Sequence, residues 1–273
     1  MINVILINIL IQLIYFVLII FIFGIIIHYI NKYFYKTTNY NKFIVILTGF
    51  IGVPIHELSH AFMCLLFGHK ITEMKLFIPN NNDGVLGYVS HKYNPKNIYQ
   101  KTGNYFIGIA PIIFGSLILT IAMVLLVPRT YNNLYTDLYE IIKLQNSGLY
   151  LNVIENEFLL SIKMFQKIFI NGKYDYKWWI FIIVSMCIAL HMSLSKADIK
   201  NSLPALPFVI IIIIVLNFAL GFISKSVYQS ITEYILMGCS YLLFSLILSI
   251  LMGLILLLIT IIIRSIVKLV KRH

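Results

Sequence analysis

The stretch that decides the fold is Pro54-Ile-His-Glu-Leu-Ser-His-Ala61, inside an apolar run from Phe43 to Phe67. That run is long enough to cross a bilayer as one helix, which takes about 20 apolar residues. On a helix, His56 and His60 lie on the same face, about one turn apart. This spacing is typical of two Zn²⁺ ligands, with Glu57 beside the open coordination position as a base. Ionisable groups are costly at membrane depth, so the cluster favours a functional site over a chance match.

The composition indicates a polytopic membrane protein. The chain is 60% hydrophobic and 11% charged, with a mean hydropathy of +0.91, whereas soluble domains are about half apolar and a quarter charged. We therefore predict an all-α polytopic membrane protein, folded as a single domain over residues 1–273, with about six transmembrane helices and a small membrane-associated β-hairpin. The predicted spans are Ile2–Ile30, Phe43–Phe67, Asn104–Val127, Trp178–Leu194, Ala205–Ile223 and Tyr234–Ile263.

The net charge of +11 is spread over the connections between these spans. A nucleic-acid-binding protein would gather its lysines and arginines on one soluble face, so we expect no nucleic-acid partner. The basic residues are better explained as contacts with anionic lipid headgroups and as signals that set the orientation of the spans in the membrane. The basic C-terminal tail favours both termini in the cytoplasm, because lysines and arginines are enriched on that side of the membrane. Lys32, Lys36 and Lys42 would then lie outside, against this tendency.

Two connections carry structure of their own. Residues 71–93 alternate in polarity around the turn cluster at 79–84, which predicts a β-hairpin. It either closes a surface loop or offers an edge strand to an extended peptide. The second connection is a long extramembrane loop at about 128–177. Within it, apolar residues from Leu151 to Phe169 recur at helical spacing, which predicts an interfacial amphipathic helix with Glu157 off its apolar face.

A catalytic zinc takes three protein ligands and a water, so one ligand must come from another segment. Asp198 is the acidic residue at a plausible depth and is the predicted third ligand, although an ordinary carboxylate at a helix end would fit the same pattern. His191 lies two turns earlier on nearly the same face and could support the site, replace a ligand or simply pack. Asn201 could bind Asp198 or a substrate carbonyl, or cap a helix.

The three cysteines all lie in apolar runs and do not suggest a disulfide framework. Cys64 continues the four-residue spacing from His60. One straight helix cannot easily place His56, His60 and Cys64 around one ion, because the outer pair is about 12 Å apart along the axis. We interpret Cys64 as a packing residue.

The segment from Gly52 to Ala61 resembles the zinc-binding helix of the site-2 protease family of intramembrane metalloproteases. The hairpin resembles the membrane-associated β element of that family, and Ser195-Lys-Ala-Asp198 resembles the position of its aspartate ligand. The resemblance covers about residues 43–203. Because Ile199 follows Asp198 where that family commonly has glycine, the resemblance is to a divergent, minimal branch.

The resemblance implies one Zn²⁺ per chain on His56, His60 and Asp198, with Glu57 as the catalytic acid and base. It also implies an intramembrane endopeptidase of the bacterial cytoplasmic membrane. Its partner would be a membrane-anchored protein or peptide, such as an anti-sigma factor, a signal-peptide remnant or a pheromone precursor. The alternatives are a catalytically silent zinc-binding scaffold and a metal-binding transporter, but the retained base argues against the first and the lack of repeated halves against the second.

Overall fold

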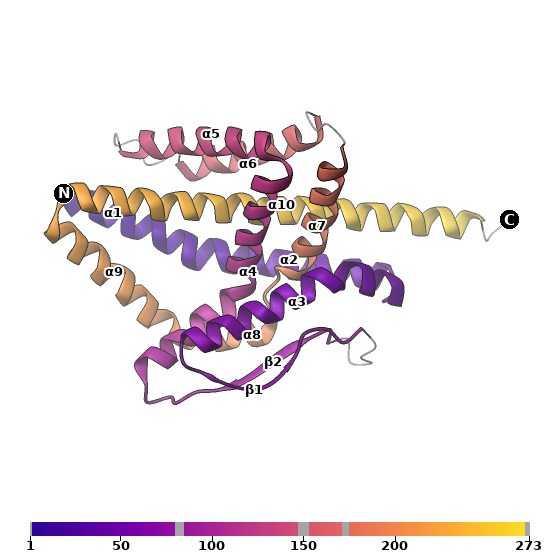
Figure 1. Ribbon diagram of the computed structural model, residues 1–273, viewed down its shortest axis with the longest axis horizontal. Helices are drawn as coiled ribbons and strands as arrows, with labels where there is room; N and C mark the ends of the chain where they lie inside the picture. The colour runs from indigo at the N-terminus through magenta and orange to yellow at the C-terminus, as the bar shows by residue number, and fades with distance from the viewer. Residues whose placement is uncertain (1, 80–84, 147–152, 171–174, 271–273) are drawn as a thin grey trace.

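The computed structural model describes residues 2–79, 85–146, 153–170 and 175–270. Within these residues the chain is mostly helical, with one antiparallel pair of strands (Figure 1). The helices are α1 Ile2–Leu13, the π-helical η1 Ile14–Ile19, α2 Ile20–Thr37, α3 Lys42–Leu66, α4 Ile98–Leu126, α5 Pro128–Asn146, α6 Val153–Ile170, α7 Tyr176–His191, α8 Lys196–Ser202, the 3₁₀ turn η2 Leu203–Ala205, α9 Leu206–Ile223 and α10 Lys225–Val270. The strands are β1 Lys70–Lys75 and β2 Tyr88–Lys92.

Five helical segments in the described part are long and apolar enough to cross a membrane, which confirms the predicted polytopic class. They are Ile2–Thr37, Lys42–Leu66, Ile98–Leu126, Lys196–Ile223 and Lys225–Val270.

The predicted span Trp178–Leu194 differs, because it forms the 16-residue helix α7. At 1.5 Å per residue α7 extends about 24 Å, less than the hydrocarbon core of about 30 Å. The helix ends at His191, and residues 192–195 are not helical.

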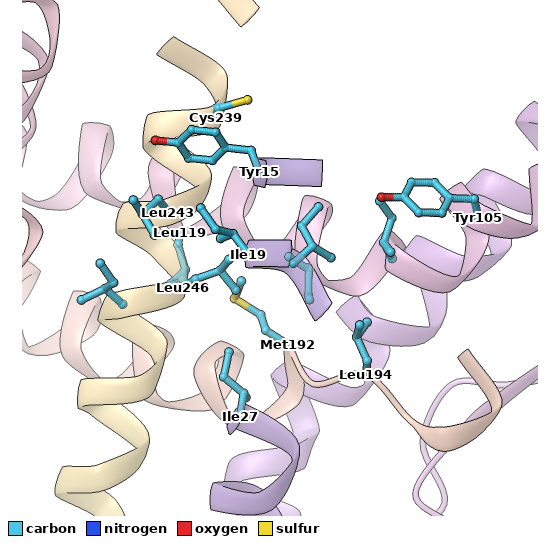
Figure 2. Packing of buried hydrophobic residues seen from close by; sticks show 14 of the residues in the cluster. Tyr15, Ile19, Ile27, Tyr105, Leu119, Met192, Leu194, Cys239, Leu243 and Leu246 are labelled. Carbon is cyan, nitrogen blue, oxygen red and sulfur yellow. The ribbon is translucent and has the colours of Figure 1, made fainter. Parts of the chain in front are cut away.

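The largest buried cluster fixes the break between α7 and α8. Met192 and Leu194 lie in this break and are each only 1% exposed. Figure 2 shows Met192 between Ile27 of α2 and Leu246 of α10, with Leu119 of α4 nearby. Because close packing drives helix association within a membrane, these contacts hold the start of α8 in place.

The hairpin predicted at residues 71–93 is confirmed. β1 and β2 pair antiparallel, with Ile71 opposite His91 and an irregularity between Ile71 and Glu73. The turn predicted at 79–84 lies outside the described residues apart from Pro79. Both strands contact α3, which places the hairpin beside the helix that carries the histidines (Figure 1).

The region predicted as a long loop is largely a pair of helices, α5 and α6, which pack on each other and on α10. The amphipathic helix is present as α6. Glu157 was predicted to lie off its apolar face, but this prediction is wrong, because Glu157 lies on the buried side of the helix. Glu157 is 2% exposed and accepts hydrogen bonds from Tyr15 and, at 2.6 Å, from Ser240 Oγ. Burial raises the pKa of the Glu157 carboxyl. The two donors satisfy the carboxyl oxygens. Both come from distant segments, so the periodicity of α6 could not predict them.

Candidate active site

The two histidines of α3 meet through their Nε2 atoms. α3 is helical throughout, so the four-residue spacing brings these atoms to 3.1 Å from each other. Their ring centroids are 4.8 Å apart. His56 and His60 therefore present two imidazole nitrogens to one point beside the helix.

The opposite nitrogen of each ring is held by a backbone carbonyl. His56 Nδ1 lies 2.7 Å from the carbonyl oxygen of His191, and His60 Nδ1 lies 2.7 Å from that of Ile107. A carbonyl oxygen only accepts, so each Nδ1 carries the proton and each Nε2 has a free lone pair. This arrangement is common around metal-bound histidines, because it fixes the ring and strengthens the ligand.

Both carbonyls lack the usual donor within their own helix. The partner of Ile107 would be residue 111, but Pro111 has no N–H. The partner of His191 would be the N–H of Ser195, which instead donates to Asp198 Oδ2 at 2.8 Å. Neither acceptor was predicted from the sequence, although a proline four residues after Ile107 was a signal for one of them.

Asp198 reaches the histidines from α8. Ser195 caps this helix through its Oγ, which accepts from the Asp198 N–H at 3.1 Å, and Asp198 Oδ2 accepts from the Ser195 N–H in return. This reciprocal pair is a capping box, and it leaves Oδ1 free to point elsewhere. Asp198 Oδ1 lies 3.5 Å from His60 Nε2.

The structure thus brings together the three residues predicted as zinc ligands. One ligand atom each from His56, His60 and Asp198 lies within 4.8 Å of the others. Two imidazole nitrogens and a carboxylate oxygen are a donor set that zinc accepts, with a fourth position left for water. The tautomers fixed by the carbonyls fit such an ion, because both Nε2 lone pairs are available.

Glu57 lies in the wall of a cavity that is also lined by His56, His60 and Asp198. Its side chain is 6% exposed, and the cavity has a volume of about 750 Å³. The hairpin closes over it: a Cβ added to Gly87 would lie 2.8 Å from Glu57 Cγ. Residues 85–89, His91 and Lys196 also line this space, so the hairpin and Glu57 bound the same cavity.

His191 and Asn201 have different positions. The His191 ring is 8% exposed, and its Nε2 lies 3.2 Å from the hydroxyl of Tyr35. His191 supports His56 through its backbone carbonyl, while its ring packs against α3 at Gly52. Asn201 lines the cavity.

One comparison with known proteins covers this region. Residues 49–141 match the model of a family described as "Putative zincin peptidase". The chain is similar to a zinc peptidase family. The matched segment contains His56, Glu57, His60 and Pro111, and it ends before Asp198. The match supports a zinc metallopeptidase-like protein, and the apolar helices support a membrane protein. No curated protein and no solved structure matches the sequence.

Replacing Gly52 with alanine is expected to loosen the site. A Cβ at Gly52 would lie 2.3 Å from the Cys187 carbonyl oxygen and 2.3 Å from His191 Cδ2, so α7 must move away from α3. Such overpacking costs about 1 to 3 kcal/mol. We expect Gly52→Ala to lower the thermal midpoint in detergent and to weaken zinc binding.

Gly238→Ala is the matched control, since nothing lies within 4 Å of a Cβ added there in α10. Alanine gains about 1 kcal/mol of helix propensity at both positions. Gly238→Ala should therefore hold or raise the midpoint. Equal shifts in the two variants would contradict the close contact between α3 and α7.

Proposed function

We propose that this chain is a zinc-dependent intramembrane endopeptidase, similar to the site-2 proteases, which hydrolyses peptide bonds of membrane-anchored proteins or peptides. The observation that carries the proposal is the convergence of His56 Nε2, His60 Nε2 and Asp198 Oδ1, with both Nδ1 atoms fixed by carbonyls. α3 and the segment containing α8 are both candidate membrane spans. The match to a zincin peptidase family supports the same class of enzyme.

In this proposal each polar residue has one task. Zinc held by His56, His60 and Asp198 would supply Lewis acidity to the scissile carbonyl and lower the pKa of water. Glu57 takes the proton from the attacking water and passes it to the nitrogen of the leaving amine. The C–N bond breaks as this nitrogen is protonated, giving a carboxylate and an amine.

A substrate helix hides its peptide bonds in its own hydrogen bonds, so it must unwind before attack. The hairpin offers a surface for the unwound segment, because its residues 85–89 line the cavity beside Glu57. Strand addition would hold the segment through backbone hydrogen bonds, with little dependence on its sequence. This geometry supports an extended, membrane-anchored substrate.

The proposal is tested with the whole 273-residue chain in detergent and a purified single-span membrane protein as substrate. We expect cleavage to fall to background when a chelator removes the metal, and to return on addition of Zn²⁺ but not of Mg²⁺, because the site offers two imidazoles. Zinc binding without cleavage of any membrane-anchored substrate would favour the silent scaffold. Full cleavage in the metal-free protein would reject the proposal.

A further inference from the structure

A second cluster of metal-ligating side chains lies one turn beyond His60. In the part of the chain that the structure describes, Cys64, His69 and His91 each offer a ligand atom within 4.8 Å of the other two. Cys64 is 0% exposed and His69 is 3% exposed, while His91 is half-buried. The residues come from the end of α3, the turn that follows it and β2.

The end of α3 folds His69 back over Cys64. The Gly68 N–H donates to the Leu65 carbonyl at 3.1 Å, and the His69 N–H donates to the Cys64 carbonyl at 2.7 Å. This pair of bonds is a Schellman motif, which needs a residue in the left-handed region after the helix. Gly68 fills that position, with a φ of 69°. Such a motif places the residue after the glycine against the last turn, here the turn that carries the thiol.

The two imidazoles face each other through their Nδ1 atoms, which lie 3.0 Å apart. His69 Nε2 lies 2.7 Å from the Gln100 carbonyl oxygen, so Nε2 carries the proton and Nδ1 has the free lone pair. Tyr93 stacks on the His69 ring with centroids 5.0 Å apart and holds its orientation. His91 reaches this point because it pairs opposite Ile71 in the sheet.

We propose that Cys64, His69 and His91 form a second Zn²⁺ site, which ties β2 to the end of α3. Ligand atoms at about 2.0 to 2.3 Å from a tetrahedral zinc lie about 3.3 to 3.6 Å from one another. The observed atoms lie within 4.8 Å of one another, so zinc binding requires the side chains to draw closer. On binding, Cys64 releases its thiol proton to solvent and coordinates as the thiolate, and water takes the fourth position. Thiolate and imidazole together suit zinc better than magnesium or calcium.

Two further features agree with this site. The Gln100 carbonyl supports His69 in the way that carbonyls support His56 and His60. His91 also lines the cavity beside Glu57, so an ion at this site would hold one wall of the cavity in place.

The test uses cobalt as a spectroscopic probe of the metal-free, 273-residue chain. The group formed by His56, His60 and Asp198 offers only nitrogen and oxygen, so a thiolate-to-cobalt charge-transfer band would report the second site alone. We expect wild type to show this band with Co²⁺ and to bind two Zn²⁺ per chain by mass spectrometry. Cys64→Ser should lose the band and one of the two zinc ions. Cys187→Ser, at another buried cysteine, should keep both.

His60→Ala separates this inference from the proposed function. It should lose the zinc of the first group and keep the charge-transfer band. If Cys64→Ser does not fold, His91→Gln on the hairpin removes a ligand without changing α3 and should also lose the band. Absence of the band in wild type, or its persistence in Cys64→Ser, would overturn the second site and leave the first untouched.

Discussion

Glu57→Gln is expected to lower the rate of peptide cleavage by about 10²- to 10⁴-fold, the usual contribution of a general base. The amide keeps the size of the side chain in its buried position against Gly87. It cannot accept the proton of the attacking water. Because Glu57 is not among the three grouped ligands, zinc content should not change. The measurement is the initial rate of substrate cleavage together with zinc per chain.

Glu155→Gln is the matched control, since it makes the same chemical change at an exposed position in α6. It should leave the rate of cleavage and the zinc content as in wild type. Equal cleavage by Glu57→Gln and wild type would exclude Glu57 as the base. A Glu57→Gln variant that lost its zinc would show instead that Glu57 holds the metal.

Asp198→Asn is expected to weaken zinc binding by more than about 100-fold, beyond the usual loss when a supporting residue around a metal is changed. The amide oxygen can still accept from the Ser195 N–H, so the N-terminus of α8 should stay folded. The charge that balances the ion is lost. The measurement is a titration of the protein with zinc in the presence of a competing chelator.

Ser195→Ala separates the capping of α8 from the binding of zinc. It removes the Oγ that accepts from the Asp198 N–H and leaves the carboxylate in place. Loss of such a cap costs about 1 kcal/mol, so the thermal midpoint should fall while zinc stays bound. Unchanged zinc affinity in Asp198→Asn would remove Asp198 from the ligand set.

The sequence predicted the parts of the site that depend on local periodicity. The spacing of His56 and His60 needs only an α-helix, and the alternation at 71–93 needs only a turn to form a hairpin. Asp198 was found by exclusion, because few carboxylates lie in apolar segments. The structure places its oxygen 3.5 Å from His60 Nε2.

The remaining features depend on contacts between distant segments. The helical spacing of the apolar residues predicted a polar face for Glu157, but Tyr15 and Ser240 supply hydrogen-bond donors to it within the bundle. Cys64 is buried as the packing interpretation requires, yet its neighbour His91 comes from a strand 27 positions later. No local pattern contains that information.

The two carbonyls that hold the histidines belong to different helices, α4 for His60 and α7 for His56. Each imidazole is therefore oriented by its own neighbour rather than by a shared support. A displacement of α4 would release one ring and leave the other aligned, and the reverse holds for α7. Loss of the proposed zinc from this site should consequently proceed in separable steps, each traceable to the helix that moved.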